Sequence, residues 1–360
     1  MAIARRKFIG FALAAMTLSV LVGLVAALAA DLYLHRRAER SAGLNRWGYR
    51  GPVVGRKEPG ELRVVVLGGS TAFGYGVTWD QAIPALLERR LNQQNGQAHA
   101  RVVNLGFNNE GAYSFLPTLE DFDYLDYDVV CFYEGYNDLI GDLAPNTAVY
   151  RHESAVFRLT GYFPILPLAL REKALLFRYG GDLKAAYADP FDESPGKTVF
   201  RPNLAARTSA TALETAGEVS KSLSRQLDRL SAEKPPAVVA VSEAGCAFPW
   251  ANYCQAIFVA TRYVLDHGKA VAIIAQPRKL EVGAQRHTQQ QHALVAMIAR
   301  HFSTSPRVRY VDLKDSVNLK DTNIVFDGMH LNADGNDRIA AGLVEPVLAL
   351  AAVRKATPSP

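Results

Sequence analysis

Short apolar runs alternate along most of the chain with longer stretches in which apolar residues recur at helical spacing. The short runs are rich in β-branched residues and predict strands at residues 63–67, 101–104, 128–132, 269–275 and 308–312. The longer stretches predict helices at residues 82–93, 250–267, 287–302 and 333–351. Such alternation is typical of a parallel sheet with helices on both faces, so we expect a three-layer α/β fold with about five strands.

The alternation stops between residues 138 and 235. A structureless loop of that length is foreign to a compact domain, so residues 141–235 are predicted to form an inserted, mostly helical subdomain. Residues 156–170 are strongly apolar, and residues 206–234 have the pattern of a polar amphipathic helix. The apolar stretch could be a lid over an acyl chain, a surface that rests on a bilayer, or the core of the insert.

The amino-terminal pattern predicts a membrane span. Residues 8–30 contain no charged side chain and follow Arg5, Arg6 and Lys7, and the run is long enough to cross about 30 Å of hydrocarbon as a helix. A cleaved signal peptide, a twin-arginine export signal and a buried core helix are the alternatives, and an uncleaved anchor is favoured. Basic residues flank the run equally on both sides, so their count does not fix its orientation.

These patterns divide the chain into successive parts. Residues 1–35 are the expected anchor or signal, residues 36–60 a linker, residues 61–352 the folded domain with its insert, and residues 353–360 a disordered tail. With 49% hydrophobic residues the domain can bury a sizeable core. The excess of 40 basic over 35 acidic residues lies largely near the amino terminus, so we expect no nucleic-acid partner.

The histidines and cysteines do not have the spacing of a metal site, and we expect no metal. Cys246 and Cys254 could pair across their short loop in an oxidising compartment, or remain two unlinked core residues. Cys131 lies in an apolar run and is predicted to be a buried thiol. His287 and His292 lie on a glutamine-rich helix and are predicted to be solvated.

Two polar motifs lie where an α/β sheet binds ligands. Gly68, Gly69 and Ser70 follow the first strand, where glycines permit a sharp turn that exposes the serine hydroxyl. A phosphate cradle or a plain turn would have the same residues. Near the carboxyl end, Asp327 precedes His330 by three residues, so the carboxylate could accept the imidazole N–H and leave the other ring nitrogen free to take a proton.

Two further motifs follow the second and third strands. Asn137 comes shortly after the third strand, where its amide could donate a hydrogen bond to a developing oxyanion, although such a residue is often only a turn former. The segment from Asn104 to Gly111 follows the second strand and could supply a backbone N–H to the same oxyanion. Gln276 ends the fourth strand and could line the same pocket, or simply precede the strand-terminating proline.

The four motifs together, in this order, resemble the SGNH (GDSL-like) serine hydrolases, and residues 45–51 resemble the lead-in segment of membrane-anchored bacterial members. The resemblance covers roughly residues 45–350 and implies a flavodoxin-like three-layer fold without a cofactor. It implies Ser70 as nucleophile, His330 as general base and Asp327 as the residue that orients it. The implied oxyanion donors are the Ser70 N–H, the Asn137 side chain and the Gly111 N–H, with Asn109 as the alternative to Gly111. Gly69 departs from the family motif, which has aspartate there.

The resemblance therefore implies a serine esterase or deacylase, exported and membrane-anchored, with its catalytic domain in the periplasm. Its substrate would be an ester-bearing small molecule, lipid or glycan. An O-acyltransferase acting on a polysaccharide would use the same residues. A non-catalytic carbohydrate-binding or assembly factor would not require Ser70, Asn137, Asp327 and His330 as a set, and a nucleotide-binding protein would require a lysine that the glycine-rich turn lacks.

Overall fold

The computed structural model describes residues 2–41, 43–94, 99–139, 141–143, 149, 151–152, 154–178, 243–278 and 282–356. The chain divides into two compact units. The first contains residues 1–38 and 154–235, and the second contains residues 39–153 and 236–360. Each unit is described by itself.

The second unit is built on a parallel sheet. Its strands are β1 (Leu62–Gly68), β2 (Ala100–Asn104), β3 (Val129–Glu134), β4 (Ala270–Ala275) and β5 (Val308–Asp312), in the order β2-β1-β3-β4-β5. Every pair is parallel. This order is that of flavodoxin-like folds, in which the chain leaves β1 for one neighbour and then returns to the other side. The carboxyl end of β1 is therefore the switch point at which ligands bind in open α/β sheets.

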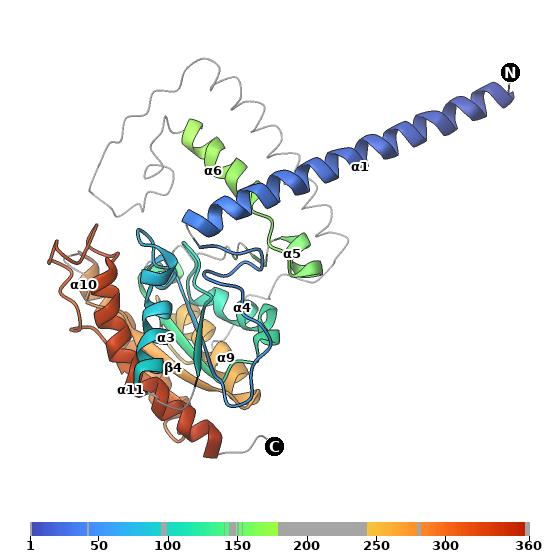
Figure 1. Ribbon diagram of the computed structural model, residues 1–360. Coiled ribbons are helices and arrows are strands. Elements are labelled where there is room, and N and C mark those ends of the chain that lie inside the picture. Colours follow the sequence, from blue (N-terminus) through green and yellow to red (C-terminus); the bar gives the residue numbers. More distant parts are fainter. Residues whose placement is uncertain are drawn as a thin grey trace. The chain divides into compact units, whose positions relative to one another are not determined.

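Helices cover both faces of this sheet (Figure 1). On one face α3 (Ile83–Gln94) and α11 (Ala333–Ala356) lie side by side and bury Leu87 and Leu343 against strand residues such as Val66. On the other face Phe115 of α4 (Phe115–Asp121) stacks on Phe132 of β3 with ring centroids 4.5 Å apart. The remaining helices are α2 (Ser70–Phe73), α9 (Ala251–Asp266), α10 (Val282–Phe302) and the 3-10 helices η1 (Trp79–Gln81), η2 (Ala112–Ser114), η3 (Asp123–Leu125), η4 (Tyr136–Asp138) and η5 (Gly141–Leu143).

The predicted three-layer fold and its five strands are confirmed. Each strand lies within two residues of its predicted position, because residues of the inner strands are buried on both faces and must be apolar throughout. Helix α4 was not predicted. Its seven residues are too few to show a helical period.

The prediction that His287 is solvated is wrong. His287 is buried and its ring lies 5.3 Å from that of Tyr136. It lies at helical spacing with Gln290, Leu294 and Met297, all of which are buried, so α10 buries a stripe that begins with two polar residues.

The first unit contains all but the last three residues of the long helix α1 (Ala2–Ser41), with the short helices α5 (Ala155–Thr160) and α6 (Leu166–Arg178). Its segment Ile9–Glu39 is long and apolar enough to cross a membrane. Side chains such as Leu18 and Val25 are more than half exposed. The helix continues beyond residue 35, through the first part of the predicted linker, to Ser41.

Polar contacts at the end of the apolar run attach α1 to the connection between α5 and α6. Asp31 accepts a hydrogen bond from the N–H of Leu166 at 2.6 Å, at the start of α6, and another from the Tyr162 hydroxyl. The His35 ring lies 2.7 Å from the Phe163 carbonyl. Both Asp31 and His35 are buried.

The apolar stretch of the predicted insert has both buried and exposed side chains. Within the apolar stretch, Phe157, Phe163 and Ile165 are buried, whereas Leu159 is 82% exposed. The predicted helix at residues 206–234 lies outside the described residues. At the carboxyl end α11 continues to Ala356 and so includes the first four residues, 353–356, of the predicted disordered tail; residues 357–360 lie outside the described part.

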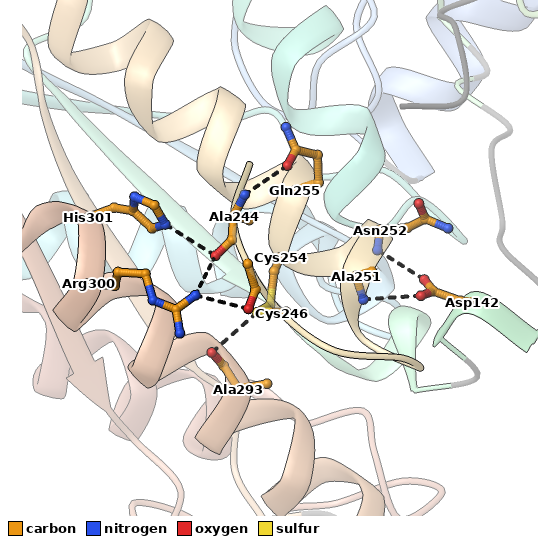
Figure 2. The surroundings of a disulfide bond; sticks show 11 residues. Asp142, Ala244, Cys246, Ala251, Asn252, Cys254, Gln255, Ala293, Arg300 and His301 are labelled. Carbon is orange, nitrogen blue, oxygen red and sulfur yellow. Dashed lines mark hydrogen bonds between the residues drawn. A yellow bond between two sulfur atoms is a disulfide. The ribbon is translucent and has the colours of Figure 1, made fainter. Parts of the chain in front are cut away.

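A disulfide joins Cys246 to Cys254, as one of the two alternatives predicted (Figure 2). It ties the segment before α9 to the first turns of that helix. Arg300, from α10, donates to the Gly245 carbonyl at 2.9 Å, so this segment is also held from a second helix. Cys131 is buried and free, as predicted, and burial raises the pKa of its thiol to about 12.

A thiol count tests this arrangement. The purified full-length chain, unfolded without reductant, should react with a thiol reagent at Cys131 alone, and at all three cysteines after reduction. The native protein should react slowly, because Cys131 is inaccessible and the thiolate is the reactive form. Three reactive thiols in the unfolded, unreduced protein would contradict the pairing.

Candidate active site

The turn after β1 presents Ser70 at the carboxyl edge of the sheet. Gly68 has a φ of +155°, and a Cβ there would lie 2.1 Å from the Tyr133 carbonyl oxygen of the adjacent strand. Only glycine therefore fits where β1 turns away from β3. Ser70 then begins α2, directly after the turn.

Gly69 is required by space, since its φ of −81° is ordinary. A Cβ at this position would lie 2.1 Å from the Asn137 amide nitrogen and 2.9 Å from the Glu110 carbonyl oxygen. The side chain of Asn137 fills the volume that an aspartate would need. As this turn is built, position 69 has no room for the aspartate of the Gly-Asp-Ser motif.

Three side chains from the two ends of the domain form a hydrogen-bonded chain. The Nε2 atom of His330 lies 2.7 Å from the Ser70 hydroxyl oxygen, and its Nδ1 atom lies 2.8 Å from Asp327 Oδ2. Ser70 and His330 are 260 positions apart in the sequence. The arrangement can move a proton from a serine hydroxyl to an imidazole whose other nitrogen is held by a carboxylate.

A tight turn holds Asp327 in place. Its Oδ1 atom accepts the backbone N–H of His330 at 2.9 Å and that of Met329 at 3.2 Å, which leaves Oδ2 for the imidazole. Burial alone would raise the pKa of Asp327, but the hydrogen bonds from His330 and Met329 outweigh it and hold the pKa below its ordinary value. Asp327 is therefore a carboxylate at neutral pH.

The Asn137 side chain reaches the turn from β3. It belongs to η4, and its Nδ2 atom donates to the Glu110 carbonyl at 2.7 Å. One amide hydrogen is thus held by the segment after β2, and the contact with Gly69 places the amide beside the serine turn.

The segment after β2 closes the same edge. Asn104, at the end of β2, donates to the carbonyls of Ala72 and Phe73 and so holds α2 in place. Asn109 has a φ of +62°, the left-handed conformation that favours glycine and that asparagine tolerates best among other residues. Gly111 is extended, with a φ of −116°. The unusual backbone conformation is therefore at Asn109.

A model of the GDSL-like lipase/acylhydrolase family matches residues 66–338. The chain belongs to this family. The predicted resemblance to the SGNH (GDSL-like) hydrolases is confirmed, whereas the likeness of residues 45–51 to membrane-anchored members lies outside the match and stays a prediction. Membership makes the protein a hydrolase that acts on ester bonds. No match was found among curated proteins.

Solved structures that resemble this GDSL-like hydrolase are distant in sequence. The lipase/acylhydrolase from Enterococcus faecalis is 13% identical, with 79% of this chain and 95% of the other covered and a TM-score of 0.41. A family 3 carbohydrate esterase from Clostridium thermocellum is 11% identical, with 81% and 99% covered and a TM-score of 0.39.

Two buried polar residues, Arg50 and Gln276, brace the site of this GDSL-like hydrolase, and the sequence predicted this role for neither. Arg50 donates to the carbonyls of Phe73, Gly74 and Val77, and thereby fixes the loop after the serine helix. Burial lowers its pKa to about 10. Gln276, which was expected either to line the pocket or to precede a strand break, is buried, and it donates to the Thr71 hydroxyl.

Arg151 forms a buried ion pair with Glu110, in the segment after β2. The two groups are 3.0 Å apart, and both side chains are 1% exposed. Arg151 also donates to the Leu105 carbonyl at 2.9 Å and the Gly48 carbonyl at 3.2 Å. It therefore joins the lead-in segment to the loop whose Glu110 carbonyl holds Asn137.

Replacing Arg151 with methionine should lower the free energy of unfolding by about 3–5 kcal/mol, because it leaves the Glu110 carboxylate buried without its cation. Urea denaturation of the full chain in detergent, followed by tryptophan fluorescence, measures the change. Arg262→Met is the control, since its ion pair with Glu243 is more than half exposed on both sides and should be worth less than about 1 kcal/mol. Equal losses in the two variants would contradict the account.

Proposed function

We propose that this GDSL-like hydrolase is a serine esterase in which Ser70 is the nucleophile. The observation that supports it best is the continuous hydrogen-bonded chain from Ser70 through His330 to Asp327. Ser70, the first residue of this hydrogen-bonded series, lies at the carboxyl edge of the sheet, beside the Asn137 amide. A serine, a base and a carboxylate in this geometry carry out acyl transfer on unrelated folds.

In the first half of the reaction the Ser70 oxygen attacks the ester carbonyl carbon. Its proton passes to His330 Nε2, which lies 2.7 Å away, and the imidazolium that forms is stabilised by the Asp327 carboxylate. The tetrahedral intermediate then collapses: the bond to the leaving alcohol breaks, and the alcohol takes the proton from His330. Ser70 remains as an acyl ester.

In the second half a water molecule attacks the acyl-enzyme. His330 takes a proton from the water as the new carbon–oxygen bond forms, and returns it to the Ser70 oxygen as that oxygen leaves. The acid is released and the hydrogen-bonded chain is restored. Asp327 stays a carboxylate throughout, in agreement with its lowered pKa.

Three donors are proposed for the oxyanion that forms in both halves. The Ser70 N–H and the Asn137 amide supply two of them. The third comes from the segment after β2, where Gly111 is the residue expected by type and the left-handed turn supports the Asn109 N–H as the alternative. Losing one such donor costs about 10²–10³-fold in rate in serine hydrolases.

We also propose that α1 anchors the enzyme in a membrane with the hydrolase domain on the extracytoplasmic side. The apolar segment Ile9–Glu39 supports a span, and the disulfide between Cys246 and Cys254 supports an oxidising compartment. The substrate would be an ester-bearing small molecule, lipid or glycan. An O-acyltransferase would use the same acyl-enzyme, with a sugar hydroxyl in place of water.

Turnover of p-nitrophenyl acetate, butyrate and decanoate by the full chain in detergent tests the proposal. Release of p-nitrophenol with an equal amount of free acid is the result expected of an esterase. In the presence of an oligosaccharide, p-nitrophenol in excess of free acid, with acylated sugar as the other product, would assign the transferase reaction instead. If the folded protein turns over none of the esters, the proposal loses its support.

A further inference from the structure

Two acidic side chains behind the proposed oxyanion hole have no part in the proton transfers. Glu134 is the last residue of β3 and is 3% exposed, and Asp138 ends η4 four residues later. Burying a carboxyl group destabilises the fold unless its oxygens are hydrogen-bonded. Their partners therefore indicate what the two residues do.

Both oxygens of Glu134 accept backbone N–H groups. Oε2 accepts the N–H of Gly69 at 3.0 Å, in the turn that presents Ser70. Oε1 accepts the N–H of Gly135 at 2.7 Å and that of Asn137 at 3.3 Å. One carboxyl group thus fixes the serine turn relative to the backbone that carries the Asn137 amide.

Asp138 holds the third segment. Its Oδ2 atom accepts the N–H of Ala112 at 3.0 Å, in the loop after β2. The same carboxyl group packs directly on Gly111, where a Cβ would lie 2.7 Å from Oδ1. The segment with the third proposed oxyanion donor is therefore placed by Asp138.

The two carboxyl groups are also hydrogen-bonded to each other. Two carboxylates have only acceptor atoms, so this contact requires a proton between them. Burial, and then the charge of Asp138, raise the pKa of Glu134 well above its ordinary value, and burial raises the pKa of Asp138 to about 6. With this proton between them the pair carries one negative charge, which opposes a nearby oxyanion less than two charges would.

We propose that Glu134 and Asp138 form a carboxyl pair that positions the three segments of the oxyanion hole. They are positioning residues and do not touch the reacting atoms. The inference rests on the proposed serine-esterase mechanism, which it deepens by naming what holds the donors in place.

The two isosteric amide variants should behave differently. Glutamine at position 134 keeps one acceptor oxygen, so either the Gly69 N–H or the N–H groups of Gly135 and Asn137 would meet an NH₂ group. E134Q should therefore lower kcat about 100-fold with little change in KM, as expected when oxyanion donors are displaced. In D138N the oxygen can still accept the Ala112 N–H while the NH₂ group replaces the shared proton, so the loss of kcat should be much smaller than in E134Q.

The measurement is kcat and KM for p-nitrophenyl acetate with the full chain in detergent, beside the melting temperature of each variant. V130A, a cavity variant in the same strand, is the stability control and should lower the melting temperature without lowering kcat. Wild-type kcat in E134Q would overturn the proposal. The proposal would also be overturned if E134Q and D138N lost the same amount of kcat and each loss matched the fall in that variant's melting temperature. S70A with wild-type activity would instead refute the esterase mechanism itself, so the two failures are distinguishable.

Discussion

Replacing Ser70 with alanine should lower kcat for p-nitrophenyl esters by on the order of 10⁶-fold, which is the loss seen when a serine hydrolase is deprived of its nucleophile. The variant keeps His330 and Asp327, but no acyl-enzyme can form without the hydroxyl that lies 2.7 Å from the imidazole. Fold and substrate binding should persist, because the Gly69 N–H remains bound to Glu134 and the turn is unchanged. Initial rates and the melting temperature, measured on the same preparation, check both statements.

Ser305→Ala is the matched control, since Ser305 lies in the turn between α10 and β5 and should leave kcat unchanged. Activity in Ser70→Ala within about tenfold of the wild type would show that ester hydrolysis does not use this serine.

Replacing Asp327 with asparagine should lower kcat by roughly 10⁴-fold, although the side chain keeps its shape. Oδ1 accepts the N–H groups of Met329 and His330, so the amide oxygen must occupy that position. The NH₂ group then faces His330 Nδ1 and donates to it. The imidazole proton moves to Nε2, which points at Ser70, and the ring can no longer accept the serine proton.

This effect of the His330 tautomer is measured as the difference between the pH-independent kcat values of Asp327→Asn and the wild type. Asp337→Asn is its control, because Asp337 pairs with Arg90 in a partly exposed contact between α11 and α3 and should leave kcat unchanged. If Asp327→Asn kept more than about a tenth of the activity, the carboxylate would not be needed to set the tautomer of His330.

The fold was predictable because the sheet is buried on both faces. Residues such as Val65 and Ile273 are buried on strands with neighbours on both sides, so their runs are continuously apolar and bounded by polar turns. The prediction was wrong at His287, where burial of a polar stripe on α10 has no apolar signature. Whether a histidine is solvated depends on the residues that pack against it. Here the ring of Tyr136, in η4 after β3, packs against His287.

The site was predictable in part, because Ser70, Asn137, Asp327 and His330 follow a motif order that the structure brings together. The residues that brace them were not. Glu134 acts through Gly69, 65 positions away, and such a contact has no fixed spacing in the sequence. The choice between Gly111 and Asn109 stays a prediction, because residue type favours the first and backbone conformation the second.

A covalent adduct on Ser70 tests the central claim most directly. The full chain in detergent is treated with a fluorophosphonate, digested and sequenced by tandem mass spectrometry, beside a sample unfolded before treatment. The account predicts one modified residue, Ser70, in the folded protein and no modification in the unfolded one, because only the folded protein places His330 against the hydroxyl. An unmodified Ser70 in the folded, ester-hydrolysing protein, or an adduct on another residue that abolishes activity, would contradict it.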